Sequence, residues 1–207
     1  DYSNDTATAV AKGPLSVARY GLAASSARAN ALPVSEAPTL NTSIQYIPFG
    51  YFGGGGYPAV ATVNLINFSN DTVTTSSKGP LVNAKGSLAA TGNKYYGYFG
   101  GGLANFNNPS IRSSIDRIDY LNDTATALSK GQLGNPLYGL SATGNSDFGY
   151  FGSGFFSYSP SISIADVQRI DYSNDTATAV VRTYLSSPNY LPQAATGNQD
   201  FGYFGGG

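Results

Sequence analysis

The sequence predicts an all-β fold built from four repeats of about 52 residues, each forming a small antiparallel sheet of four strands. Asn-Asp-Thr recurs from Asn4, Asn70, Asn122 and Asn174, and Gly-Tyr-Phe-Gly recurs from Gly50, Gly97, Gly149 and Gly202. No long window keeps a helical hydrophobic period without a glycine or proline. A sheet this small covers its two faces only by packing against neighbours, as the blades of a β-propeller do.

The second repeat illustrates the four predicted strands in order. The first is Ser87–Thr91, closed by Gly92-Asn93, and the second is Tyr95–Gly100. The third is Ile115–Tyr120, after which Asn122-Asp123 makes a turn, since both residue types tolerate turn conformations. The fourth is Thr124–Leu128. We expect each repeat to pair these strands within itself.

Alternation along a strand predicts which side chains share a face. Side chains of neighbouring residues point to opposite faces, so Tyr98 and Phe99 are expected on different sides of the sheet. Ile118 and Tyr120 should share one face, with Ile115 on the other. Both faces are therefore apolar, which requires a neighbouring sheet on each side.

We predict one domain over residues 1–207. Its repeats span about 15–80, 81–132 and 133–184, and a composite blade joins 185–207 with 1–14. The first repeat carries a proline-containing insertion at 26–43, expected as an exposed loop that contacts partners. The composite blade would close a four-bladed ring. The alternatives are a longer ring of five to eight blades or a ring shared by several chains.

The order of these motifs resembles the kelch repeat. Gly100-Gly101 and Gly205-Gly206 match its double glycine, which Ser153 interrupts in the third repeat. Tyr120 and the Asn-Asp-Thr that follows match its tyrosine and turn. The resemblance covers nearly the whole chain and implies a kelch-like propeller.

The sequence departs from the kelch pattern at two places. Small residues, Ala127 and Ala179, stand where the last kelch strand carries tryptophan. The basic residue before the first strand is present only as Arg19 and Lys85. We therefore expect the packing between blades to differ.

The Asp-Tyr-Ser-Asn-Asp-Thr and Gly-Tyr-Phe-Gly-Gly-Gly runs are also similar to repeat proteins of marine phages and marine bacteria, which implies a virion-surface or cell-surface protein.

Composition excludes several classes of chemistry. Cysteine and histidine are absent, which rules out disulfides, Cys/His metal sites and a histidine base. Eleven basic and twelve acidic residues leave a net charge of −1, which gives no electrostatic sign of nucleic-acid or anionic-membrane binding. No apolar run is long enough to span a membrane. We expect neither a cofactor nor a metal.

The acidic residues are expected to be structural. Asp116, Asp119 and Asp123 lie close together, but no calcium-loop pattern surrounds them. We predict that such residues cap turns and pair with Arg117 or Arg169. Asn-Asp-Thr also fits an N-glycosylation pattern, but its repetition at one place favours a turn. The glycine runs lack the strand–loop–helix context of a phosphate site and are predicted to be strand ends.

No catalytic residue is predicted, because acids that repeat with the fold indicate packing. The first hypothesis is a non-enzymatic structural and binding module on a virion or cell surface, which contacts a protein or glycan through loops at one end. The alternatives are a glycosidase-type carbohydrate-active enzyme and a purely architectural repeat; self-association through the incomplete blade would add a second copy as partner. The candidate binding residues lie in the variable loops and the insertion: Tyr57, Phe106, Asn107, Phe155, Phe156, Tyr158, Leu32, Val34 and Glu36.

Overall fold

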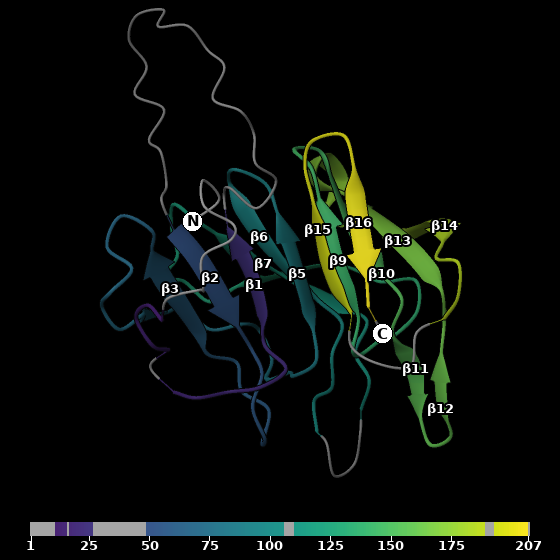
Figure 1. Cartoon of the computed structure of the whole chain (residues 1–207), viewed down its shortest axis with the longest axis horizontal. Helices are drawn as coiled ribbons and strands as arrows, with labels where there is room; N and C mark the ends of the chain where they lie inside the picture. Colours follow the sequence, from purple (N-terminus) through teal and green to yellow (C-terminus); the bar gives the residue numbers. More distant parts are fainter. Residues whose placement is uncertain (1–10, 16, 27–48, 106–109, 189–192, 207) are drawn as a thin grey trace, which may run out of the picture.

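The computed structural model describes residues 11–15, 17–26, 49–105, 110–188 and 193–206. This part of the chain forms antiparallel β-structure without an α-helix, and Figure 1 shows its sheets following one another in sequence order. None of its helices is long and apolar enough to cross a membrane. The all-β prediction is confirmed.

Three four-stranded sheets pair their strands within one repeat each, as expected. Sheet 1 consists of β1 (Ala23–Ser26), β2 (Phe49–Gly53), β3 (Val63–Asn67) and β4 (Ser76–Lys78). Sheet 2 consists of β5 (Ala89–Gly92), β6 (Tyr96–Gly100), β7 (Ser114–Asp119) and β8 (Leu128–Gln132). Sheet 3 consists of β9 (Ser141–Gly144), β10 (Phe148–Gly152), β13 (Asp166–Asp171) and β14 (Val180–Tyr184).

Two hairpins complete the described structure. One is β11 (Phe155–Tyr158) with β12 (Ser161–Ser163), inserted between β10 and β13. The other, called here the terminal hairpin, is β15 (Ala194–Gly197) with β16 (Gly202–Gly205). A 3-10 turn, η1 (Tyr172–Asn174), follows β13, and the Asp171 side chain accepts a hydrogen bond from Ser173 N–H there.

The predicted position of the fourth strand is wrong by several residues. In sheet 2 it begins at Leu128, and Thr124 lies in the preceding turn. The reason is that this turn's backbone bonds to the neighbouring sheet: Gly79 N–H donates to Asp123 O at 2.8 Å, and Ala127 N–H donates to Pro80 O at 2.8 Å. Those groups are therefore not available for a ladder within their own repeat.

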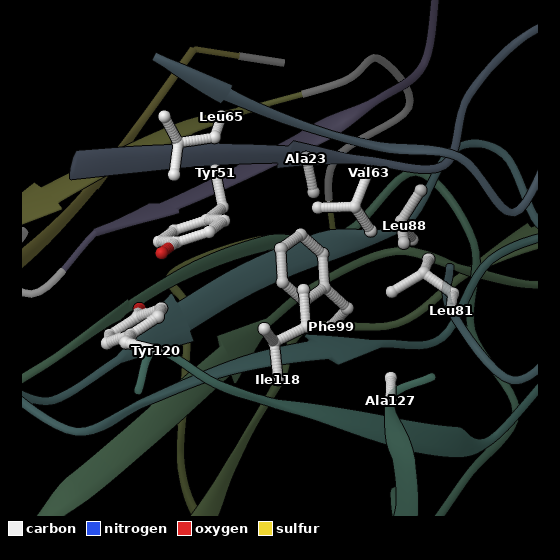
Figure 2. Close-up of a cluster of buried hydrophobic side chains, with 10 residues drawn as sticks. All are labelled: Ala23, Tyr51, Val63, Leu65, Leu81, Leu88, Phe99, Ile118, Tyr120 and Ala127. Carbon is white, nitrogen blue, oxygen red and sulfur yellow. The ribbon is translucent and has the colours of Figure 1, made fainter. Parts of the chain in front are cut away.

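The two faces of sheet 2 pack against different neighbours. Phe99, Ile118 and Tyr120 join a buried cluster with residues of sheet 1, which Figure 2 shows around the Phe99 ring. Tyr98 and Ile115 join a second cluster with residues of sheet 3. The face assignments made from alternation are therefore confirmed, and the double-sided burial explains why both faces are apolar.

Sheet 2, sheet 3 and the terminal hairpin each place one aromatic ring on a glycine of the sheet before them. A Cβ placed on Gly53 would lie 2.8 Å from Phe99 Cε1, and one on Gly100 would lie 2.7 Å from Phe151 Cε1. At Gly152 the ring is Phe204 of the terminal hairpin, at 2.5 Å. These glycines are required because any side chain would occupy the space that the ring fills.

A second contact links each sheet to the next through a tyrosine and an aspartate. Tyr98 of sheet 2 stacks on Tyr172 of sheet 3 with 4.7 Å between ring centroids. Its hydroxyl donates to Asp175 Oδ2 at 3.1 Å. Arg117 and Lys130 lie 2.7 and 3.4 Å from the same carboxylate. The predicted pairing of an aspartate with Arg117 is thus confirmed, but it crosses between sheets.

The same arrangement links sheets 1 and 2. Tyr51 stacks on Tyr120 with 4.9 Å between centroids, as Figure 2 shows. Tyr51 donates to Asp123 Oδ2 at 2.9 Å, and Lys78 lies 3.2 Å from Asp123 Oδ1. Before sheet 1, Lys12 lies 3.5 Å from Asp71. The turn that the Asn-Asp-Thr motif makes therefore serves as the attachment point of each sheet.

The basic residue before the first strand enters a buried polar site in the middle of its sheet. Lys85 is fully buried, lies 3.2 Å from Asp116 Oδ2 and donates to Phe99 O at 3.0 Å. Arg19 donates to Thr62 O at 2.8 Å and to Asn64. For Asp116 the predicted role of capping a turn or pairing with Arg117 or Arg169 is wrong, because its carboxylate faces Lys85 in this site.

The third sheet replaces both members of this pair. Leu137 occupies the position of Lys85, and Gln168 occupies that of Asp116. Gln168 Oε1 accepts a hydrogen bond from Gly134 N–H at 2.6 Å. The cation and its partner are thus lost together, which avoids leaving an unpaired buried charge.

The glycine runs end their strands, as predicted. Gly101 has a φ of +70°, and a Cβ there would lie 2.6 Å from Leu137 O. Ser153 takes the same place in sheet 3 with a φ of +55° and donates to Ile164 O at 3.0 Å. This hydrogen bond holds a non-glycine residue in a conformation that normally favours glycine.

The described sheets do not form a closed ring. The first strand of each unit lies next to the first strand of the following unit: β1 by β5, β5 by β9, and β9 by β15. The propeller arrangement therefore stays a prediction. Residues 1–10 of the expected composite blade lie outside the described residues, but Gly13 N–H donates to Asp71 O at 2.5 Å, which attaches residues 11–15 to sheet 1.

Candidate binding surface

The β11–β12 hairpin carries three of the predicted binding residues. Phe155, Phe156 and Tyr158 were expected in a loop, but they form a strand that pairs with β12. The pairing has a shift in register between Phe155 and Ser157. Figure 1 shows the hairpin projecting beyond the sheets at the bottom of the view.

Tyr138 anchors this hairpin to the body of the fold. Its backbone exchanges two hydrogen bonds with Phe155, at 3.0 and 2.8 Å. Its ring stacks on Phe155 at 5.2 Å and lies 5.9 Å from Tyr158. Burial raises the pKa of the Tyr138 hydroxyl. Phe155 is thus half-buried and structural. Tyr138 is a surface residue that the sequence reasoning missed, since its partner lies beyond two strands and the turn between them.

The outer part of the hairpin exposes apolar area. Phe156 is 44% exposed, Tyr158 is 46% exposed and Ile162 is 42% exposed. Serines surround them, and Ser161 Oγ donates to Tyr158 O at 3.4 Å. Exposed rings held on a paired backbone lose little conformational freedom when they bind, which suits recognition of a flat apolar surface.

Tyr57 is the other predicted binding residue that the structure describes. It is 53% exposed in the connection from β2 to β3, which leaves sheet 1 at the bottom of Figure 1, the end where the β11–β12 hairpin projects. Phe106 and Asn107, and Leu32, Val34 and Glu36 of the insertion, lie outside the described residues. The predicted insertion begins at Ser26, which the structure places in β1.

The carboxylates of Asp116, Asp119, Asp123, Asp171 and Asp175 are engaged in structural contacts. Asp116 faces Lys85, while Asp123 and Asp175 join neighbouring sheets. Asp119 Oδ1 accepts from Leu121 N–H at 2.9 Å, which caps a turn as predicted, and hydrogen bonds from Ser173 lower the pKa of Asp171. No group of three or more potential metal ligands is found within the described part of the chain.

A pocket of about 320 Å³ opens between sheet 3 and the terminal hairpin. Its walls include Thr143 and Tyr150 of sheet 3, and Phe201 and Phe204 of the hairpin. Tyr150 corresponds to Tyr98, but no described tyrosine stacks on it as Tyr172 stacks on Tyr98. The pocket was not predicted; the incomplete last repeat is the sequence signal that could have indicated it.

Comparison with known proteins gives no family assignment. No protein-family model matches the sequence, and no curated protein matches it either. The resemblance to kelch repeats therefore stays a prediction that rests on the motifs themselves.

Proposed function

We propose that the protein is a non-enzymatic binding module, displayed on a virion or cell surface, that contacts a protein or a glycan through aromatic residues at one end of its sheets. The observation that carries this proposal is the β11–β12 hairpin. It presents Phe156 and Tyr158 to solvent on a backbone that Tyr138 fixes to sheet 3. Tyr57 is a further exposed aromatic residue, in the connection from β2 to β3.

The chemistry of this surface supports a neutral ligand. The hairpin consists of aromatic residues, Ile162, serines and Pro160, without a charged side chain. Tyrosine and phenylalanine rings stack on the apolar faces of sugars or on apolar protein side chains, and nearby hydroxyls donate and accept hydrogen bonds. A sugar or an uncharged peptide patch meets those requirements.

The carboxylates support a binding role over a hydrolytic one. A glycosidase needs two carboxyl groups that face a substrate. Asp123 and Asp175 instead occupy equivalent structural positions, each bonded by a tyrosine and a lysine. Symmetric positions of this kind serve packing.

Binding is tested with the double variant Phe156→Ser/Tyr158→Ser on a glycan array and against host-surface protein preparations. We expect the wild-type chain to bind selectively and the variant to lose about tenfold or more in affinity, as expected when exposed aromatic contacts are removed. Leu121→Ser is the matched control, because Leu121 is 72% exposed in a turn outside the hairpin.

Equal binding by both variants and the wild type would overturn the role of the hairpin. The enzymatic alternative is tested separately by release of reducing sugar from the same glycans. Turnover that disappears in one Asp→Asn variant with an unchanged melting temperature would overturn the non-enzymatic proposal.

A further inference from the structure

We propose that the two ends of the stack of sheets bind each other head to tail, so that sheet 1 of one molecule docks on the terminal hairpin of a second copy of this chain. The head is the outer face of sheet 1, with Phe52 and Phe68. The tail is the terminal hairpin, with Tyr203 and Gly205, together with the pocket beside sheet 3.

The basis is a contact that the fold already makes repeatedly. Each unit offers a glycine on one face and a phenylalanine on the other. The rings of Phe99, Phe151 and Phe204 lie on the glycines of the preceding unit, each close enough to exclude a Cβ. The face that carries the phenylalanine differs from the face that carries the glycine, so the contact has a direction. It can therefore be repeated by a further unit at either end.

At the two ends of the stack, one such glycine and one such phenylalanine lack this contact with another described unit. A Cβ on Gly205 would meet nothing within 4 Å among the described residues, unlike its counterparts Gly53 and Gly100. Phe52 is half-buried, whereas its counterparts Phe99 and Phe151 have no exposed area. By the pattern of the other units, Phe52 of a second molecule is the ring that would lie on Gly205.

A second pair of aromatic residues is exposed at the two ends of the stack, where the other units have a stacked pair. Within the stack Tyr51 stacks on Tyr120 of the next sheet. The residue that corresponds to Tyr120 in sheet 1 is Phe68, which is 46% exposed, and the residue that corresponds to Tyr51 in the terminal hairpin is Tyr203, which is 61% exposed. Docking the head on the tail would bury both rings against each other.

The pocket beside sheet 3 fits the segment that precedes sheet 1. Residues 1–10 have the same sequence as residues 171–180, the segment whose Tyr172 and Asp175 attach sheet 3 to sheet 2. The groups that hold Tyr172 and Asp175 are Thr91, Tyr98, Arg117 and Lys130. Sheet 3 carries Thr143, Tyr150, Arg169 and Arg182 at the corresponding positions.

Charge also matches across this contact. Arg169 and Arg182 of sheet 3 correspond to Arg117 and Lys130 of sheet 2, and the incoming segment would bring Asp5 to these arginines as Asp175 is brought to Arg117 and Lys130. Residues 11–15, which follow that segment, are already attached to sheet 1 through Gly13 and Pro14. A single docking event would therefore place sheet 1 on the terminal hairpin and residues 1–10 in the pocket.

The test is analytical ultracentrifugation of the full chain over a wide range of concentration. We expect the wild-type chain to associate as concentration rises. Gly205→Ala, which damages the tail, and Phe68→Ser, which damages the head, should each weaken association by about tenfold or more. Leu121→Ser is the control and should associate like the wild type.

A mixture of the two damaged chains gives the sharpest result. Gly205→Ala keeps an intact head and Phe68→Ser keeps an intact tail, so the mixture should form a dimer at concentrations where each variant alone is monomeric. A contact between identical faces would give no such recovery and would overturn the proposal.

Two further outcomes would also overturn it. One is a wild-type chain that is monomeric at every concentration. The other is a monomer whose melting temperature falls on Gly205→Ala in dilute solution, since that would show Gly205 making its contact within one molecule. Circular dichroism of each variant shows whether it has kept the fold of the wild type. None of these results depends on the hairpin that carries the proposed binding function.

Discussion

The edge of the Phe99 ring lies on Gly53 of the preceding sheet, so close that a Cβ on Gly53 would lie 2.8 Å from Phe99 Cε1. This relationship between a ring and a glycine recurs between successive units and sets their spacing. It explains why the Gly-Tyr-Phe-Gly motif keeps both its phenylalanine and its last glycine: each forms one half of a contact with a different neighbour.

The first prediction concerns this contact. Gly100→Ala should destabilise the protein by about 1–3 kcal/mol, because the new methyl group would overlap the Phe151 ring in a packed core. Chemical denaturation measures the change. Gly205→Ala in dilute solution is the control and should leave the free energy of unfolding unchanged, because a Cβ there meets nothing within 4 Å among the described residues. Equal effects of the two substitutions would show that the ring contact does not decide the outcome.

The second prediction concerns the hydrogen bond between Tyr98 and Asp175. Tyr98→Phe keeps the ring stacked on Tyr172 but removes the donor, and hydrogen bonds to charged groups contribute about 1.5–3 kcal/mol. We expect a loss of that size in the free energy of unfolding. Tyr95→Phe is the control, since Tyr95 is 50% exposed. In a double-mutant cycle with Asp175→Asn, simple additivity would contradict a direct coupling of Tyr98 to Asp175.

The third prediction concerns the buried pair Lys85 and Asp116. Lys85→Leu should destabilise the protein by about 3–5 kcal/mol, because it leaves the Asp116 carboxylate buried without its cation. The double variant Lys85→Leu/Asp116→Gln copies Leu137 and Gln168 of sheet 3 and should recover most of that loss. Thermal unfolding of the single and double variants measures the recovery. A double variant as unstable as Lys85→Leu would show that the pair contributes more than charge balance.

The fourth prediction concerns alkaline pH. Burial raises the pKa of Tyr51, Tyr98, Tyr120 and Tyr172 above the ordinary value of 10.0. In the unfolded chain these hydroxyls ionise near pH 10, whereas in the folded protein they are still protonated at that pH. Their contribution to stability is therefore complete below pH 10 and is lost as pH rises above it. Absorbance at alkaline pH should show exposed tyrosines ionising first and the four buried ones ionising only with unfolding. Ionisation of all tyrosines in one step near pH 10, before unfolding, would contradict this.

Local features of the sequence predicted the units correctly. Strand alternation placed Tyr98 and Phe99 on opposite faces, and the Asn-Asp turn predicted that antiparallel partners would lie within one repeat. These features depend on residues that are close in the chain, so propensity and periodicity are enough. The error in the fourth strand has the opposite cause, since the groups that decide where it begins bond to another repeat.

The candidate surface was predicted only in part. Aromatic residues after the second strand of the third repeat indicated exposed rings, and Phe156 and Tyr158 are exposed. Their organisation into a hairpin depends on Tyr138, whose backbone pairs with Phe155. A residue that lies in an earlier loop gives no local sign of such a contact.

The sequence by itself determined the repeating unit, its first three strands and the double-sided apolar character of each sheet, because these follow from turns and side-chain alternation along a short stretch of chain. Only the tertiary structure decided that Asp175 bonds to Tyr98, 77 residues away, and that Lys85 pairs with Asp116 and not with a surface charge. The physical reason is that burial between sheets selects which charges and hydroxyls meet, and that selection depends on how the sheets stack.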